Sequence, residues 1–321
     1  MIAATVESAV LNTALSNTSN SLSDPRQWLP TNFEARGEIM HRSDATTLSL
    51  ELSTMRALAE LCLRPYGDAL PDTTFRKGGD TTIQIQAEPK PRRGFEVRHA
   101  MWGLLLCGHP MLASGRVLMV ERCKLGFVTE SKAFHVIGIL KYAEVAGMLG
   151  LGEGVDVARL VRRGEGRNES LVDEGESELM VFDNLGSTIR GQNSSMILTN
   201  ASTSPGLMDG PKVGVKLLHD GAPLKESSVF FAFWEAMIDR AAKARRTEGI
   251  GPYSVRATDD KLIIQYGPVL EKTPTLDYDT VIKALSLIPR FMAMRGEYTE
   301  CDFKIYEDNK VVGRGSVWIG D

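Results

Sequence analysis

The chain has 321 residues, of which 43% are hydrophobic and 24% are charged, and its formal net charge is −4. This length allows two ordinary domains with buried cores, and the composition is typical of globular proteins rather than disordered ones. No basic tail or stripe stands out along the sequence, so it predicts no nucleic-acid partner. No apolar run is long enough to span a membrane.

The N-terminal residues bear on the location of the protein. They lack the basic segment of a secretory signal, and Glu7 interrupts the apolar stretch that such a signal requires. The sequence therefore predicts a cytoplasmic protein. Secretion stays open because Asn-x-Ser sequons, which suit a glycosylated surface, occur at Asn17, Asn168, Asn193 and Asn200.

One series of elements occurs twice along the chain, after a flexible N-terminal arm at residues 1–25. Module 1, residues 26–142, is expected to contain a strand at 33–41, a helix at 50–63, a strand at 81–86, a helix at 97–112, and strands at 123–128 and 133–142. Module 2, residues 211–321, is expected to contain a strand at 211–219, a helix at 230–246, a strand at 261–266, a helix at 279–292, and strands at 301–306 and 311–319.

Matching residues recur at a near-constant spacing, which predicts tandem homologous modules. The clearest pairs are Pro110 and Pro289, Cys123 and Cys301, and Lys132 and Lys310. Alternating strands imply one dry and one solvated face, so we expect an α+β fold with largely antiparallel sheets and helices on one face of each. Residues 143–210 form a connector with further strands, which either extends one module or bridges the two.

Two segments of module 1 resemble motifs of a large group of uncharacterised filamentous-fungal proteins. Residues 29–33, Leu-Pro-Thr-Asn-Phe, lead to Gly37, and residues 100–104, Ala-Met-Trp-Gly-Leu, are followed by Met111. In that group, an LPxNF…G start precedes an Ala-Leu-rich helix, and an AIWGxY…M helix leads into an EFxLxWxGxxVGxI hairpin.

The second module is similar to the end of the same pattern. Residues 300–303, Glu-Cys-Asp-Phe, with Val312 and Gly313, look like that hairpin, and Met292 stands where the helix methionine belongs. The first hairpin departs from it, with residues 121–123, Glu-Arg-Cys, in place of an acidic-aromatic pair. The resemblance implies a fungal source and a shared fold without an established activity, and such proteins are often associated with specialised-metabolite pathways.

Four side chains are the candidates for acid-base catalysis. His41 and His219 end corresponding strands, and Glu121 and Glu300 begin corresponding hairpin strands. If the modules pack about a pseudo-twofold axis, these groups could face a shared cleft. The alternatives are that the histidines are ordinary polar strand ends and that the glutamates form ion pairs with Arg122 or Arg295.

The sequence indicates neither a cofactor nor a metal. The glycine-rich run that begins at Gly147 lacks the Lys-Ser/Thr of a phosphate-binding loop, and no HExxH or GxSxG motif occurs. The cysteines show no metal or disulfide spacing, so buried free thiols are expected at Cys62, Cys107, Cys123 and Cys301.

Two functions follow from these observations. The first is a cofactor-free isomerase, cyclase or hydrolase-like enzyme that acts on an apolar small molecule in fungal specialised-metabolite biosynthesis. The second is a non-catalytic binding or scaffold protein that holds a protein or small ligand at the interface of its duplicated modules. A closed pocket with at least two of the four candidate side chains favours the enzyme, whereas a filled core favours the binding protein.

Overall fold

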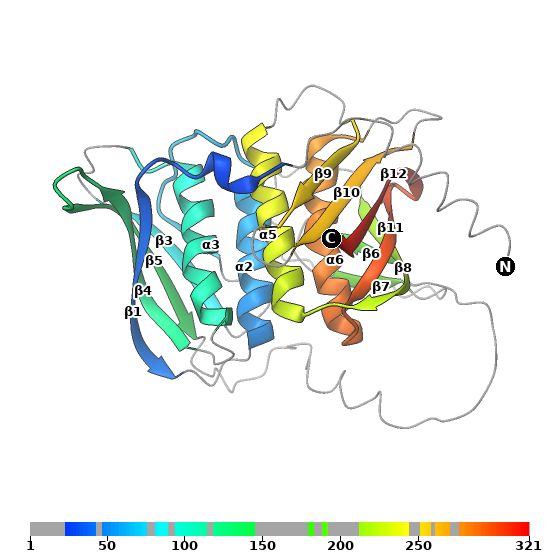
Figure 1. The fold of residues 1–321 in the computed structure, drawn as a ribbon, viewed down its shortest axis with the longest axis horizontal. Coiled ribbons are helices and arrows are strands. Elements are labelled where there is room, and N and C mark those ends of the chain that lie inside the picture. The colour runs from blue at the N-terminus through cyan, green and yellow to red at the C-terminus, as the bar shows by residue number, and fades with distance from the viewer. Residues whose placement is uncertain are drawn as a thin grey trace, which may run out of the picture.

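The computed structural model describes residues 23–42, 47–75, 81–88, 94–113, 118–144, 179–182, 188–191, 212–243, 251–257, 261–269 and 276–320. Two sheets lie on opposite sides of a layer of helices (Figure 1). Each sheet packs one face on the helices and presents an outer face on the other side. These features confirm the α+β class with helices on one face of each antiparallel sheet.

The first sheet has five strands in the order β1-β4-β5-β3-β2. Its strands are β1 (Phe33–Arg42), β2 (Thr73–Phe75), β3 (Thr81–Ala87), β4 (Leu118–Val128) and β5 (Phe134–Glu144). The helices α2 (Thr47–Cys62) and α3 (Val97–Ala113) cover its inner face (Figure 1).

The second sheet has seven strands in the order β7-β6-β8-β11-β12-β10-β9. Its strands are β6 (Leu179–Phe182), β7 (Thr188–Gly191), β8 (Val213–Pro223), β9 (Tyr253–Arg256), β10 (Leu262–Pro268), β11 (Thr299–Glu307) and β12 (Lys310–Ile319). The helices α5 (Glu226–Lys243) and α6 (Tyr278–Arg295) cover its inner face. Strands β6 and β7 come from the connector, and β6 pairs with β8.

The two halves share one order of strands. The order β8-β11-β12-β10-β9 in the second sheet matches β1-β4-β5-β3-β2 in the first, element for element along the chain. The hairpin registers differ by one residue, because Cys123 faces Leu140 in β5, 17 residues further on, whereas Cys301 faces Val317 in β12, 16 residues further on. The two cysteines lie in corresponding strands of the two hairpins.

The first strand of each half is in a different register. Gly37 of β1 faces Cys123, whereas His219 of β8 faces Cys301. His41 lies further along β1 than the position that corresponds to His219. The two histidines thus lie at different positions relative to the two cysteines, because a strand can shift along its neighbour by an even number of residues and keep the same face buried.

Helix α6 shows how local sequence sets an element's ends. The Asp277 carboxylate accepts a hydrogen bond from the backbone N–H of Thr280 at 2.7 Å, which satisfies one free donor of the first turn. Gly296 ends the helix with φ 68°, a left-handed conformation that glycine adopts without strain. None of the described helices is both long and apolar enough to cross a bilayer.

The helices of the two halves pack directly on each other. Helices α2 and α3 both contact α5, and α2 also contacts α6. At Gly108 of α3 a Cβ atom would lie 3.0 Å from the indole of Trp234 on α5, so glycine lets the two helices approach. The next residue, His109, places its ring 4.5 Å from that of Phe231. One continuous apolar core therefore runs through both halves.

A buried carboxylate fastens the N-terminal segment to the second half. Asp239 of α5 is 0% exposed and accepts hydrogen bonds from Ser23 Oγ at 2.8 Å and Trp28 Nε1 at 2.7 Å. Lys243 Nζ lies 3.3 Å from the other carboxylate oxygen. Trp28 belongs to the short 3-10 helix η1 (Pro25–Trp28), so this network joins the start of the described chain to α5.

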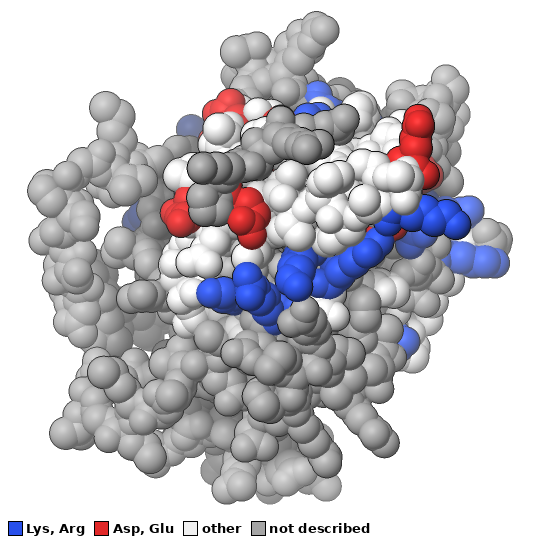
Figure 2. All heavy atoms as spheres, turned by 90° about the vertical axis from the view of Figure 1, so that its left-hand side faces the viewer, with Lys and Arg blue, Asp and Glu red and all other residues white. Residues whose placement is uncertain are grey.

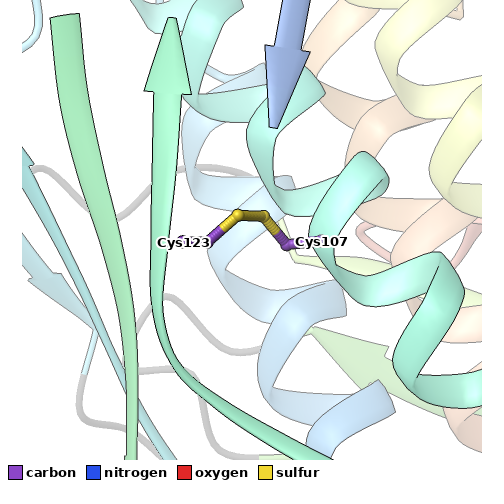
Figure 3. Close-up of a disulfide and its surroundings, with 2 residues drawn as sticks. All are labelled: Cys107 and Cys123. Atoms are coloured by element: carbon purple, nitrogen blue, oxygen red, sulfur yellow. A yellow bond between two sulfur atoms is a disulfide. The ribbon is translucent and has the colours of Figure 1, made fainter. Parts of the chain in front are cut away.

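Two cysteines form a disulfide, which corrects the expectation of four free thiols. Cys107 on α3 is bonded to Cys123 on β4 (Figure 3). Sequence spacing did not show this pair because the two residues meet only when α3 packs across β4, where their Cα atoms are 6.7 Å apart. Cys62 and Cys301 are free and buried, as predicted.

Replacing Asp239 with alanine should lower the free energy of unfolding by about 3 kcal/mol, because it leaves buried donors without an acceptor. Urea unfolding followed by tryptophan fluorescence measures this loss, with the exposed Glu130→Ala as control. A loss no larger than that of the control would show that Asp239 does not anchor the N-terminal segment.

The disulfide closes a loop across a sequence separation of 16, and a loop of this length stabilises a fold by about 3 kcal/mol. A reductant should therefore lower the melting temperature of the wild-type chain and leave that of a Cys107→Ala/Cys123→Ala variant unchanged. Alkylation of the denatured, unreduced chain should modify Cys62 and Cys301 alone. Alkylation of all four cysteines would contradict the pairing.

Candidate functional site

The four predicted catalytic residues lie in two different sheets. His41 and Glu121 are on the neighbouring strands β1 and β4, and His219 and Glu300 are on the neighbouring strands β8 and β11. The helix layer lies between these two sheets (Figure 1). The structure thus brings the residues together in pairs within each sheet, and it does not gather all four around one cleft.

Both glutamates occupy irregular positions in their strands. Glu121 falls where the register of β4 against β1 shifts, and Glu300 falls where that of β11 against β8 shifts. The carboxylate of Glu300 accepts hydrogen bonds from the backbone N–H groups of Ile319 at 2.9 Å and Ala222 at 3.3 Å. Glu300 therefore ties the strands on both sides of β11 together, which is a structural role at a bulge.

The outer face of the five-stranded sheet carries a row of cations. Arg36 of β1 faces Lys124 of β4, Lys124 faces Ile139 of β5, and Ile139 faces Gln86 of β3. The buried neighbours Cys123 and Leu125 point to the helices, so Lys124 between them points outward. Figure 2 shows the Lys and Arg side chains crossing this face as a continuous band.

Two more cations extend this row. Arg122 precedes Lys124 by two residues on the same face of β4, and Lys141 follows Ile139 by two residues on β5. We call Arg36, Arg122, Lys124 and Lys141 the basic row. Placing like charges on facing residues, as at Arg36 and Lys124, destabilises a sheet. Such a loss of stability is typical of a surface that serves binding.

The environment of Arg36 shows how the row is held. Its guanidinium lies 2.9 Å from the carboxylate of Glu34, and the two side chains are 50% and 49% exposed. The same guanidinium stacks 4.2 Å from the ring centre of Phe134 on β5. At this exposure the ion pair contributes little, so Arg36 keeps most of its capacity to attract an anion.

A groove lies at the end of the β4–β5 hairpin. Its volume is about 820 Å³. It is lined by Thr31, Asn32, Phe127, Val128, Thr129, Glu130, Ser131, His135, Val136 and Ile137. The strand pairing is tight here, since a Cβ atom on Gly126 would lie 2.2 Å from the backbone oxygen of His135. Apolar side chains and polar hydroxyls thus meet at this end of the hairpin.

The groove rests on a packed aromatic base. The ring of Phe127 lies 5.4 Å from that of His99 and 5.5 Å from that of Phe33. His99 is buried, and its Nδ1 accepts a hydrogen bond from the backbone N–H of Glu96 at 3.0 Å. This buried histidine is held by the core. A rigid base of this kind preserves the shape of the groove.

The seven-stranded sheet also carries a row of cations, three in number, on its own outer face. Lys216 of β8 faces Lys304 of β11, and Lys304 faces Arg314 of β12. The two faces differ at their edges. In the first sheet β1 is the terminal strand beside the basic row, whereas in the second β8 is covered by β6.

The exposed cations of the basic row can serve binding. Within the described residues, no group of three or more His, Cys, Asp or Glu side chains is placed to hold a metal ion. A cationic row on a sheet face can hold an elongated ligand that has carboxylates along its length.

Sequence reasoning missed the basic row because its members are scattered along the chain. Arg36 and Lys124 become neighbours only through the pairing of β1 with β4. The available signal was the alternation of Arg122 and Lys124 with buried Cys123 and Leu125, which places both cations on one face.

No known family model matches this chain, and neither a curated protein nor a solved structure is significantly similar to it.

Replacing Glu300 with alanine should lower the free energy of unfolding by about 1–3 kcal/mol, because two strand N–H groups lose their acceptor. Replacing it with glutamine should cost less, since the amide oxygen still accepts a hydrogen bond. Thermal unfolding of both variants measures the difference. Equal stability of the alanine variant and the wild type would show that Glu300 has no structural role.

Proposed function

We propose that the protein is a non-catalytic binding protein whose basic row holds an extended acidic segment of a partner protein. The observation that carries this proposal is the direct juxtaposition of Arg36 and Lys124 on an exposed sheet face beside the edge strand β1. A partner's carboxylates offset the repulsion between these cations.

The edge of the sheet adds a second means of attachment. Strand β1 ends the five-stranded sheet, so among the described residues the backbone groups on its outer edge have no strand partner. An extended peptide can add to such an edge through main-chain hydrogen bonds while its side chains contact the neighbouring face. Arg36 lies on β1 itself, which places charge recognition beside this edge.

The pattern of charge favours an acidic peptide over a nucleic acid. The row is narrow, and the carboxylates of Glu34 and Glu130 lie beside it or in the groove. A nucleic acid binds by neutralising many phosphates and is repelled by such carboxylates. A short acidic peptide needs only a few cations, and it can avoid these two carboxylates.

The filled core supports binding over the enzyme alternative. A cofactor-free isomerase, cyclase or hydrolase-like enzyme would need His41, His219, Glu121 and Glu300 to meet around a substrate. The separation of these residues into two sheets, with a continuous apolar core between, favours the scaffold. An apolar small molecule of fungal specialised metabolism remains the ligand that the enzyme alternative proposes.

We further propose that the two halves arose by tandem duplication and that the chain belongs with the filamentous-fungal group that its motifs resemble. The shared strand order supports the duplication. The Cys107–Cys123 disulfide favours an oxidising compartment over the cytoplasm, because thiols in the cytoplasm are kept reduced. The four sequons, which lie outside the described residues, agree with this location.

A matched pair of charge reversals tests the binding function. Arg36→Glu/Lys124→Glu removes the centre of the basic row, and Lys216→Glu/Lys304→Glu makes the same change on the other sheet. The probe is a labelled peptide of about 12 alternating Glu and Val residues, and its binding is measured by fluorescence anisotropy at low and high salt. The first variant should weaken binding at least about tenfold, and the second by less than about twofold.

Equal losses in the two variants would contradict a specific site on the first sheet. Tighter binding of a single-stranded oligonucleotide than of the acidic peptide would favour a nucleic acid over a peptide. Equal binding of a Lys and Val peptide would contradict recognition by charge.

A further inference from the structure

A buried carboxyl group lies at the contact between the two halves. Glu51 of α2 is 0% exposed, and neither of its carboxylate oxygens has a hydrogen-bond donor among the described residues. An ionised carboxylate in such surroundings is strongly destabilised by the loss of its hydration. The protonation of Glu51 therefore affects the stability of the whole contact.

A second carboxyl group, on α5 of the other half, acts on Glu51 where α2 packs against α5. Glu226 lies in the first turn of α5, where a negative charge is stabilised by the helix dipole. The hydroxyl of Tyr298, in the segment between α6 and β11, donates a hydrogen bond to Glu226 Oε1 at 2.8 Å. Glu226 and Tyr298 are partly exposed, whereas Glu51 lies beneath them.

The other charged and titratable groups of this region have different partners. Arg56, further along α2, is attracted by Glu60 and repels Arg290 of α6. Tyr142 of β5 lies beside Thr54, one turn along α2. The group that acts electrostatically on Glu51 across the contact is Glu226, and its effect is repulsive.

Burial and the negative charge of Glu226 together raise the pKa of Glu51 from 4.5 to about 9. Burial, followed by the hydrogen bond to Glu226, also raises the pKa of Tyr298, so its hydroxyl stays protonated as a donor. In the neutral form, the Glu51 hydroxyl can donate to Glu226, which provides the partner that the ionised form lacks. The phenol and the protonated carboxyl thus both stabilise the Glu226 carboxylate.

We infer that Glu51 and Glu226 share one proton across the contact of α2 with α5, and that this proton is a pH-sensitive latch between the two halves. With the proton in place, a hydrogen bond joins the helices. Without it, two carboxylates face each other and one of them is fully buried. The latch is closed at neutral pH and opens under alkaline conditions.

The direction of the pH dependence follows from the pKa of Glu51, which is 4.5 in the unfolded chain and about 9 in the folded chain. Between pH 4.5 and about 9 the folded chain holds a proton on Glu51 that the unfolded chain releases. The contribution of this group to stability is therefore greatest below pH 4.5, declines as the pH rises, and reaches its lowest value above about 9. A glutamine at position 51 keeps a donor at every pH and removes this decline.

Thermal unfolding near pH 6 and near pH 9 tests the latch. Between these conditions the melting temperature of the wild type should fall by at least about 5 °C more than that of Glu51→Gln. Glu297→Gln, which changes an exposed carboxyl next to Tyr298, is the matched control and should follow the wild type. A pH dependence of Glu51→Gln parallel to that of the wild type would overturn the proposal.

A second measurement reports opening at the helix contact directly. The thiol of Cys62, at the end of α2, is 0% exposed, and its backbone oxygen accepts a hydrogen bond from the hydroxyl of Tyr278 on α6. Near pH 9 a thiol reagent should label Cys62 at least about tenfold faster in the wild type than in Glu51→Gln. Near pH 6 the two rates should agree. Equal rates at both pH values would show that proton loss does not open the contact.

Discussion

The fold depends on the packing of α2 and α3 from the first half against α5 from the second. Each sheet is apolar on the side that faces the helices, and each pair of helices is apolar on both sides. Neither half can bury its helices alone, because one side of each pair would face water. The contact of Gly108 with Trp234 and that of His109 with Phe231 show how closely the two halves approach.

This arrangement determines which surfaces remain for function. The helices occupy the inner face of both sheets, so ligands have access to the outer faces and the edge strands. On the first sheet the outer face carries the basic row, and β1 ends the sheet. The proposed binding surface follows from this packing, since a core filled by helices leaves the outer sheet faces exposed.

Much of the fold could be predicted from the sequence. The alternation of residues 81–86 predicted β3, and the apolar spacing of residues 50–63 predicted the helix α2. Cys123 and Cys301 lie in corresponding strands of the two hairpins. Local periodicity is informative here because each element has one buried side. The short strands β2 and β9 were missed, since three or four residues show too little alternation.

The candidate sites were harder to predict because they depend on contacts between distant segments. The Cys107–Cys123 disulfide requires α3 to lie across β4, and the basic row requires β1 to pair with β4. Glu51 offered a signal in retrospect, because it shares the buried side of α2 with Met55 and Leu58. A charged residue at an apolar position of a helix is a reason to search for its partner.

Calorimetry of the full chain tests most directly whether the two halves share one core. If α2 and α3 depend on α5 for burial, heating produces a single transition, and the calorimetric and van't Hoff enthalpies agree. Residues 26–142 alone should show no cooperative transition. Two separate transitions in the full chain, or cooperative melting of the isolated first half, would contradict the account.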